Sequence, residues 1–264
     1  MHAHPASHPH PFQLTGQVAL VTGASSGIGR ATALLFASAG AAVVVGARRA
    51  AALDTLVDEI ETAGGHAAAL AGDVRDESFA QALVALARSR FGGLDIAFNN
   101  AGTLGALGPT PEVSLEAWRE AVDVNLTGAF VGAKHQLPAL RERGGGALIF
   151  TSTFVGHTAG FPGTACYAAS KSGLIGLTQA LAVEAAADGI RVNALLPGGT
   201  DTPLAHAMNG TAEQMAAVAQ LHALGRIASP EEIARAALFL ASPASSFMTG
   251  TAMLVDGGVS IKKG

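Results

Sequence analysis

Short apolar runs separated by helix-length segments repeat along this chain, and this alternation restricts its fold more than any other feature. Six runs are rich in β-branched and aliphatic residues: 18–21, 41–45, 66–71, 94–98, 147–150 and 190–195. A seventh run of the same kind lies at 251–255. Alternating strands and helices are typical of a parallel sheet, whose strands are apolar on both faces because helices cover both. The pattern predicts a doubly wound α/β fold of about seven parallel strands.

The segment 14–264 is expected to form one domain. It has no internal repeat, and no linker rich in Ser, Gly or Pro divides it. Two helix starts can be identified, because Ser114 precedes an amphipathic segment and Ser229 precedes Pro230 and two glutamates.

Residues 1–13 differ from the rest of the chain, since histidines alternate with prolines at His2, His4, His8 and His10. This composition predicts a disordered arm or a remnant of cloning. The histidines could bind nickel or zinc adventitiously, but nothing in such a segment fixes a coordination geometry, so no working metal site is expected.

Composition argues against several classes of function. The net charge is −4 and Lys and Arg form no dense cluster, so a nucleic-acid partner is not expected. The uncharged stretch 31–47 contains Gly40 and Gly46 and divides into a helix and a β-branched strand, so no membrane span is predicted. The single cysteine, Cys166, leaves no internal disulfide and favours a reducing compartment, the cytoplasm. We expect Cys166 to be a packing residue rather than a nucleophile.

Tyr167 is the only tyrosine, and Lys171 follows it by four residues. Apolar spacing after them predicts a helix, on which side chains four apart share one face and can reach one pocket. A nearby ammonium is expected to lower the pKa of the phenol towards neutrality, which would suit proton transfer to a carbonyl oxygen. An isolated pair of this kind is more often a half-buried tyrosine beside a solvated lysine, so this interpretation depends on the rest of the chain.

A glycine-rich turn, TGASSGIGR at 22–30, joins the first predicted strand to the next helix. Glycines allow the backbone to approach a pyrophosphate, and the N–H groups at a helix start bind its charge. The turn therefore predicts a dinucleotide site. Its spacing differs from the commoner GxGxxG, and a generic strand-to-helix turn is the alternative.

The end of the second predicted strand indicates which dinucleotide is bound. An acidic residue there accepts a hydrogen bond from a free ribose 2′-hydroxyl, whereas arginine often accompanies a 2′-phosphate. Here Ala47 is followed by Arg48 and Arg49, and guanidinium groups match phosphate in geometry. We therefore expect NADP(H) to be preferred and NAD(H) to remain usable. A solvated basic helix start is the alternative.

Over residues 14–260 the chain resembles the short-chain dehydrogenase/reductases, a family of Rossmann-fold enzymes. Matching motifs occur in the same order along the chain: TGASSGIG at 22–29, Asp73 with Val74, NNAG at 99–102, Asn125, a hydroxyl residue after the fifth strand, Tyr167 with Lys171, Asn193, Pro197 with Gly198, and DGG at 256–258. The resemblance implies hydride transfer between a nicotinamide cofactor and a ketone, aldehyde or alcohol.

The motifs and the resemblance together assign residues to the cofactor and to catalysis. The expected cofactor-binding residues are Gly23, Ser25, Ser26, Gly27, Ile28, Gly29, Arg48, Arg49, Asp73, Val74, Asn100, Ala101, Gly102, Tyr167, Lys171, Pro197, Gly198, Thr200 and Thr202. In the family the tyrosine is the general acid/base, and the lysine lowers its pKa and binds the nicotinamide ribose. A serine orients the substrate carbonyl, and the asparagine, here Asn125, holds a water of the proton relay.

The position of the family serine is the one departure. Thirteen residues before Tyr167 stands Phe154, which has no polar group to donate. Alignment from the fifth strand puts Thr153 in its place, and Ser152 is the other candidate. Adjacent residues leaving a strand point in opposite directions, so only one of the two is expected to face the substrate.

The resemblance also predicts surroundings for the site. Residues 203–225 occupy the position of a mobile substrate lid, with an ordinary amphipathic helix as the alternative. Leu104, Leu107, Phe154 and His157 are expected to line the substrate cleft. Long apolar helices after Ser114 and around Leu174, together with the resemblance, suggest a homotetramer.

Two functions remain in competition. The first is an NADP(H)-dependent oxidoreductase; the second is an NADPH-binding sensor or scaffold with weak catalysis, since a fold alone does not specify turnover. Neither the substrate nor the direction of reaction follows from these residues.

Overall fold

The structure is a computed structural model that describes residues 11–263. Residues 1–10 and 264 lie outside the described range, and with them the possible metal binding by His2, His4, His8 and His10. Of the predicted arm, the last three residues are described. Pro11 accepts a hydrogen bond through its carbonyl oxygen from the Ala244 N–H (3.2 Å), and the Phe12 ring lies 6.5 Å from that of Phe239.

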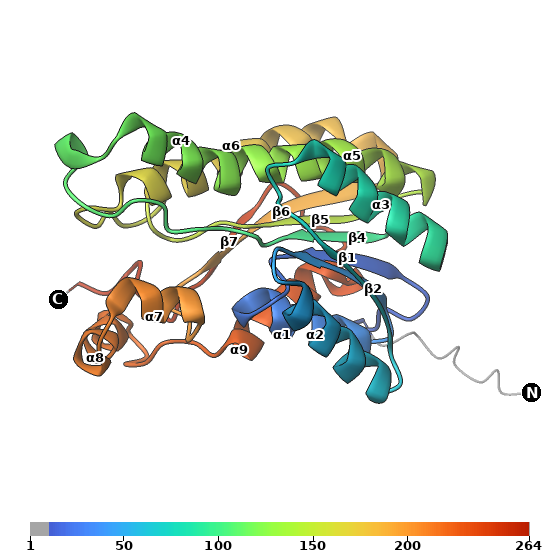
Figure 1. The fold of residues 1–264 in the computed structure, drawn as a ribbon, viewed down its shortest axis with the longest axis horizontal. Helices are drawn as coiled ribbons and strands as arrows, with labels where there is room; N and C mark the ends of the chain where they lie inside the picture. The colour runs from blue at the N-terminus through green and yellow to red at the C-terminus, as the bar shows by residue number, and fades with distance from the viewer. Residues whose placement is uncertain (1–10, 264) are drawn as a thin grey trace, which may run out of the picture.

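Within residues 11–263, seven strands form one parallel sheet in the order β3-β2-β1-β4-β5-β6-β7 (Figure 1). The strands are β1 Val18–Thr22, β2 Ala42–Ala47, β3 His66–Ala71, β4 Ile96–Asn99, β5 Gly146–Thr151, β6 Ile190–Pro197 and β7 Ala252–Val255. All seven predicted strands and the doubly wound fold are confirmed, with small shifts at the strand ends.

Helices cover both faces of the sheet (Figure 1). One layer contains α1 Gly27–Ser38, α2 Ala50–Thr62 and α9 Pro230–Ala241; the other contains α3 Glu77–Phe91, α5 Gly128–Glu142 and α6 Ala165–Glu184. Alternate residues of β1 face the two layers, because Ala19 and Val21 pack in the first core and Val18 and Leu20 in the second. Burial of the strands from both sides explains their continuous apolar sequence.

The strand order reverses between β1 and β4, and this reversal determines where a ligand can bind. From β1 the chain continues to β2 on one side of this point, and from β4 it continues to β5 on the other side. The connections therefore leave the adjacent strand ends in opposite directions, and a crevice opens between them at the carboxyl edge of the sheet. The glycine-rich turn after β1 lies at this crevice.

The predicted helix start at Ser114 is confirmed. Its Oγ accepts a hydrogen bond from the Ala117 N–H (3.1 Å) at the beginning of α4 Leu115–Val122. A π-helical turn, Asp123–Thr127, then joins α4 to α5 and contains Asn125. Such turns insert an extra residue and are frequent at functional sites. At the second predicted start, Ser229 forms a capping box with Glu232 at the beginning of α9.

Two short helices, α7 Pro203–Asn209 and α8 Ala212–Leu221, occupy the predicted lid and extend from the carboxyl edge of the sheet (Figure 1). Among the described residues of these helices, none is buried. The segment is therefore two exposed helices rather than the single amphipathic helix considered as the alternative. No helix among residues 11–263 is long and apolar enough to cross a membrane.

Candidate active site

A cavity of about 1050 Å³ opens at the carboxyl edge of the sheet and continues beneath α7 and α8. This volume is at the upper end of the range usual for ligand sites. In the described part of the chain, every predicted cofactor-binding residue except Gly29 lines the cavity. Ser152, Thr153, Tyr167 and Lys171 line it as well, whereas Asn125 does not.

The glycine-rich turn presents the start of α1 to this cavity. Gly23 has a φ of 67°, and Gly29 lies beneath the turn, where a Cβ would come within 2.4 Å of the Gly23 carbonyl oxygen. Within the described residues, the N-cap Ser26 makes no side-chain capping bond, and the first turn of α1 contains no acidic residue. The backbone N–H groups at this helix start therefore suit an anion, and the turn fits the pyrophosphate of a dinucleotide.

Two arginines lie at the end of β2 beside this turn. Arg49 donates to Ser25 Oγ and to Ser26 Oγ, both at 2.9 Å. Among residues 11–263, Arg48 forms no hydrogen bond, although its charge contributes to a lowered pKa of Asp73. The main cause of that lowering is the hydrogen bond that Arg75 donates to Asp73. Arg48 is thus the exposed cation on this wall whose donors remain available to a ligand.

Thr153 and Ser152 face different partners. The Thr153 side chain accepts from the Val155 N–H at 3.3 Å and lies near the Tyr167 phenol, whose ionised form it favours. Ser152 Oγ instead donates to the Lys171 carbonyl oxygen at 2.8 Å and ties the end of β5 to α6. The geometry favours Thr153 over Ser152 as the residue that acts beside Tyr167.

The expected lowering of the Tyr167 pKa is wrong for this structure. Burial raises the pKa of Tyr167, because a phenolate loses hydration in the cavity wall, and the nearby Thr153 side chain opposes this change only in part. The Lys171 ammonium is directed elsewhere, since its Nζ donates to the Thr151 carbonyl oxygen at 2.7 Å. The four-residue spacing correctly predicted that Tyr167 and Lys171 line one cavity, but it could not predict that both side chains lose hydration there.

Lys171 is buried, with 4% of its surface exposed, and burial lowers its pKa to about 8. A Cβ on Gly102 would lie 2.9 Å from Lys171 Nζ and 3.1 Å from Asn125 Oδ1, so both groups border the same small space. Asn125 accepts from the Thr103 N–H (2.8 Å) and donates to the Thr103 carbonyl oxygen (2.9 Å). Asn125 therefore fixes the loop after β4 from behind the cavity wall.

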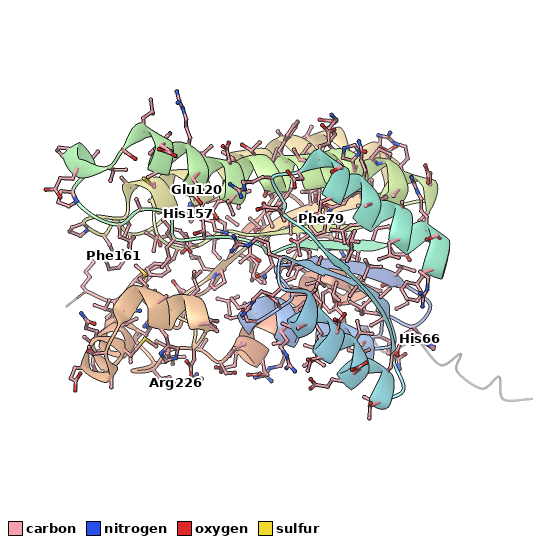
Figure 2. All side chains as sticks on the ribbon, in the orientation of Figure 1. His66, Phe79, Glu120, His157, Phe161 and Arg226 are labelled. Atoms are coloured by element: carbon pink, nitrogen blue, oxygen red, sulfur yellow. The ribbon has the colours of Figure 1, made fainter. Side chains whose placement is uncertain are left out.

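The far end of the cavity is apolar. The rings of Phe154 and Phe161 meet edge to face with centroids 5.8 Å apart, and Leu104 lies on the same wall. Leu204, Met208, Met215 and Leu221 line the cavity from α7 and α8. The prediction was wrong for Leu107, which is exposed and does not line the cavity. It was also wrong for His157, labelled in Figure 2, which is exposed and does not line the cavity either. The loop after β5 turns His157 outward and Phe161 inward, which sequence spacing does not reveal.

Two polar residues of the site were not identified as functional from the sequence. Thr22 Oγ1 accepts from the Asn100 N–H (3.1 Å) and the Ala101 N–H (3.2 Å) and so connects the two strand ends at the crevice. His222, after α8, is buried on the cavity wall. Threonine in the TG turn could have indicated the first role, whereas a lone histidine carries no comparable signal.

Comparison with known proteins agrees with this architecture. A family model described as enoyl-(acyl carrier protein) reductase matches residues 23–260. The chain is 42% identical over 250 residues to cyclohexanol dehydrogenase from Acinetobacter sp. (strain SE19), a match that spans 95% of this chain and 97% of the relative.

Two solved structures are similar over nearly the whole chain. One is a Beutenbergia cavernae protein provisionally assigned as an NAD(P)-dependent gluconate 5-dehydrogenase, with NADP bound at low occupancy; it has a TM-score of 0.89, 39% identity, and coverage of 96% of this chain and 100% of that one. The other is a 7α-hydroxysteroid dehydrogenase in complex with NADH and 7-oxo glycochenodeoxycholic acid, with a TM-score of 0.88, 34% identity, and coverage of 94% and 96%.

The different partners of the two hydroxyl groups predict different effects of their removal. Thr153→Val should lower kcat by on the order of 10²-fold, the usual effect of losing one polar group that orients a reacting oxygen. Ser152→Ala should instead cost about 1 kcal/mol of stability, the value of a typical hydrogen bond, and retain most of the turnover. Steady-state kinetics and thermal unfolding of both variants test this, and a Ser152→Ala variant that is as inactive as Thr153→Val would contradict it.

Burial of Lys171 predicts a pH-dependent difference in stability. The pKa of Lys171 is about 8 in the folded chain, against an ordinary value of 10.5 for lysine. Between these pH values the unfolded chain binds more protons, so the folded state gains stability as the pH rises. Relative to Lys171→Met, the wild-type unfolding free energy should therefore rise by about 3 kcal/mol between pH 7 and pH 11. Urea unfolding of both proteins across this range is the measurement, and parallel curves would refute the expectation.

Proposed function

Because this chain belongs to the short-chain dehydrogenase/reductase family, we propose that it is an NADP(H)-dependent enzyme that interconverts a ketone or aldehyde and an alcohol, with Tyr167 as general acid/base. The chain is an oxidoreductase acting on CH–OH groups with a nicotinamide cofactor. The observation that carries the finer proposal is that Thr153, Tyr167 and Lys171 line one cavity, with Thr153 near the Tyr167 phenol and Lys171 on the same helix as Tyr167.

The proposed chemistry assigns a role to each of three side chains on the cavity wall. A bound nicotinamide supplies or accepts the hydride. In the reductive direction Tyr167 donates its phenolic proton to the carbonyl oxygen; it is protonated at neutral pH because burial raises its pKa. Thr153 orients the same oxygen. Lys171 is still largely protonated at neutral pH, since its pKa is about 8, and its ammonium is proposed to donate to the nicotinamide ribose.

NADP(H) is the proposed preferred cofactor, with NAD(H) usable. Arg48 lines the cavity at the end of β2 and keeps its donors available, and the preceding residue is the buried Ala47 rather than a carboxylate. A 2′-phosphate carries a charge of about −1.5 to −2 and three acceptor oxygens, which Arg48 can bind. The similar structures contain NADP in one case and NADH in the other, so Arg48 rather than similarity supports this choice.

The alternative is an NADPH-binding sensor or scaffold that turns over weakly. Its support was the unsettled serine position, and Thr153 now offers a hydroxyl on the same cavity wall as Tyr167. A screen of NADPH oxidation with aliphatic, aryl and polycyclic ketones distinguishes the two functions, because a sensor would bind NADPH and reduce none of them.

Tyr167→Phe is the direct test of the proposed mechanism. The variant keeps the ring but has no proton to transfer, so kcat should fall by 10²- to 10⁴-fold or more while NADPH affinity changes little. Turnover and NADPH binding by fluorescence titration measure the two effects separately. Retention of most of the turnover would rule out Tyr167 as the acid/base.

The cofactor preference predicts a contrast between the neighbouring arginines. NADPH should exceed NADH in kcat/KM by about ten- to more than a hundredfold, and Arg48→Ala should remove most of that difference. Arg49→Ala removes the same charge one residue away and should act less, because Arg49 is bonded to Ser25 and Ser26. Steady-state kinetics with both cofactors at low and high salt decide the matter; NADH used as well as NADPH by the wild type would overturn it.

We also propose that the functional unit is a homotetramer. Leu115 and Trp118 on α4, Phe130 on α5 and Val183 on α6 are exposed on the helical layer that covers one face of the sheet. Apolar side chains exposed on neighbouring helices are typical of an interface. Sedimentation of the wild type should give a tetramer, and Phe130→Glu should weaken it. A stable, active wild-type monomer at micromolar concentration would contradict the proposal.

A further inference from the structure

His222 is the buried polar residue at the C-terminal end of α8, with 2% of its surface exposed. Its Nε2 lies 2.9 Å from the Gly199 backbone nitrogen, and its Nδ1 lies 2.9 Å from the Val218 carbonyl oxygen. The Gly199 N–H can only donate and the Val218 oxygen can only accept. The ring is therefore neutral, with its proton on Nδ1 and an acceptor at Nε2.

Gly199 lies where the chain enters and leaves the lid. Its carbonyl oxygen accepts from the Ala228 N–H (2.8 Å), and the Asp201 N–H donates to the Ala228 carbonyl oxygen (2.9 Å). The segments 199–201 and 226–228 thus pair side by side at the base of the lid. Because a Cβ on Gly199 would come within 2.8 Å of His222 Cε1, a glycine is needed for the imidazole to approach this closely.

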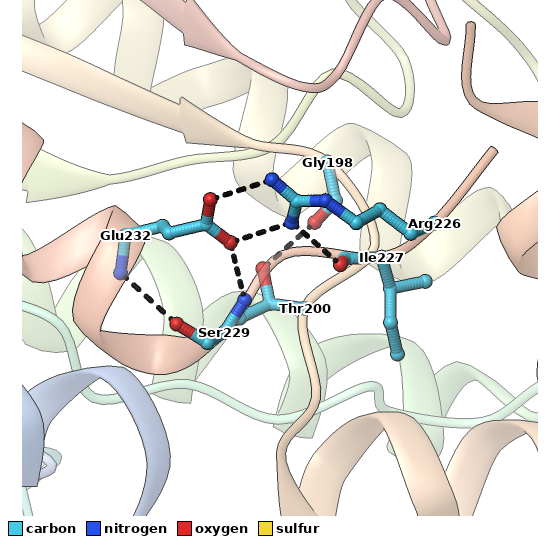
Figure 3. A network of polar contacts seen from close by, with 6 residues as sticks. All are labelled: Gly198, Thr200, Arg226, Ile227, Ser229 and Glu232. Atoms are coloured by element: carbon cyan, nitrogen blue, oxygen red, sulfur yellow. Dashed lines mark hydrogen bonds and ion pairs between the residues drawn. The ribbon is translucent and has the colours of Figure 1, made fainter. Parts of the chain in front are cut away.

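The base of the lid is anchored independently of His222 (Figure 3). Arg226 donates from both terminal nitrogens to the two carboxylate oxygens of Glu232, each at 2.7 Å. Ser229 and Glu232 form the capping box of α9, and Thr200 Oγ1 donates to the Gly198 carbonyl oxygen at 3.0 Å. These contacts fix the segment 226–228, where the chain returns from the lid, to the start of α9, but none of them reaches α7 or α8.

The lid helices have little other attachment through buried side chains. In the described structure, neither α7 nor α8 contains a buried residue. His222, the first residue after α8, is buried, and its ring joins the last turn of that helix to Gly199 at the end of β6. Lys262 Nζ also donates to the Gln220 carbonyl oxygen, and the Leu224 N–H donates to the Gly257 carbonyl oxygen at 3.1 Å, so these bonds attach the lid to the C-terminal segment. The His222 imidazole is the buried side chain that joins α8 to the end of β6.

The position of Gly199 indicates which part of the reaction this contact serves. The end of β2, with Arg48, and the end of β6, with Gly199, lie on opposite sides of the crevice between β1 and β4. β5, whose end carries Thr153, is the neighbour of β6. A dinucleotide whose 2′-phosphate meets Arg48 therefore extends its reactive end towards Thr153 and Gly199.

We infer that His222 is a positioning residue: its neutral imidazole holds α8 against Gly199 and so fixes the lid and the end of β6 around the reactive end of the cofactor. This inference rests on the proposed function. The contact with Gly199 requires a hydrogen-bond acceptor at the position of Nε2. The inference confines the effect of His222 to the end of the cavity where the reactive part of the cofactor would lie. The adenosine end, bordered by Arg48, is bound without its help.

The test compares His222→Gln, whose side-chain oxygen can still accept from the Gly199 N–H, with His222→Leu, which leaves that N–H without its partner. Affinity for NADPH should fall on the order of tenfold in the Leu variant, the effect of leaving one buried donor unpaired, and recover in the Gln variant. Affinity for 2′,5′-ADP, which carries only the adenosine end, should be equal in all three proteins. Hydrogen exchange within 203–221 should be faster in the Leu variant alone.

His206→Leu is the matched control, because His206 is an exposed lid histidine whose ring contacts Asp201 rather than Gly199. It should change neither binding nor exchange near Gly199. Equal loss of NADPH and 2′,5′-ADP in the His222→Leu variant, or unchanged NADPH affinity, would overturn the inference. So would a Gln variant as weak as the Leu variant, provided that its melting temperature matches the wild type. Failure of the wild type to bind NADPH would instead refute the proposed function.

Discussion

The close approach of three strand ends around Asn100 is the constraint on which the site depends. Asn100 donates from its side chain to the Thr22 carbonyl oxygen at 3.2 Å and accepts from Thr151 Oγ1 at 3.2 Å. It thereby joins the ends of β1 and β5 to the turn after β4. The crevice of an open parallel sheet exists because the chain diverges there, and polar side chains must satisfy the backbone groups that the divergence leaves unpaired. The glycine-rich turn after β1 and the helix that carries Tyr167 are both placed relative to this junction.

Tyr167 and Lys171, the proposed catalytic pair, illustrate a conflict between stability and chemistry. Placing Lys171 in the wall beneath Gly102 removes its ammonium from water, and one carbonyl oxygen replaces only part of that hydration. Burial likewise disfavours the Tyr167 phenolate. Each side chain would be more stable in water, so the fold must hold both against their preference for solvent. Strong shifts of this kind are typical of residues selected for reactivity rather than for folding.

Much of this arrangement could be predicted from the sequence because it is local or periodic. A strand such as β2 is a continuous apolar run, and the caps at Ser114 and Ser229 are signalled within four residues. The position of Arg48 on the cavity wall follows from its place directly after β2. Features that depend on how a loop turns could not be predicted: the choice between Ser152 and Thr153, the outward His157, and the raised pKa of Tyr167. His222 was missed because its partner, Gly199, is a backbone group 23 residues away.

The exposure of the lid helices has an evolutionary consequence. Because α7 and α8 bury none of their described residues, substitutions there remove little apolar packing and should cost little folding free energy. Leu204, Met208 and Met215 can therefore diversify while the sheet, the cofactor turn and the helix bearing Tyr167 remain unchanged. The range of substrates accepted by related proteins can therefore change through substitutions in this one surface segment, and these substitutions cost little of the stability of the fold.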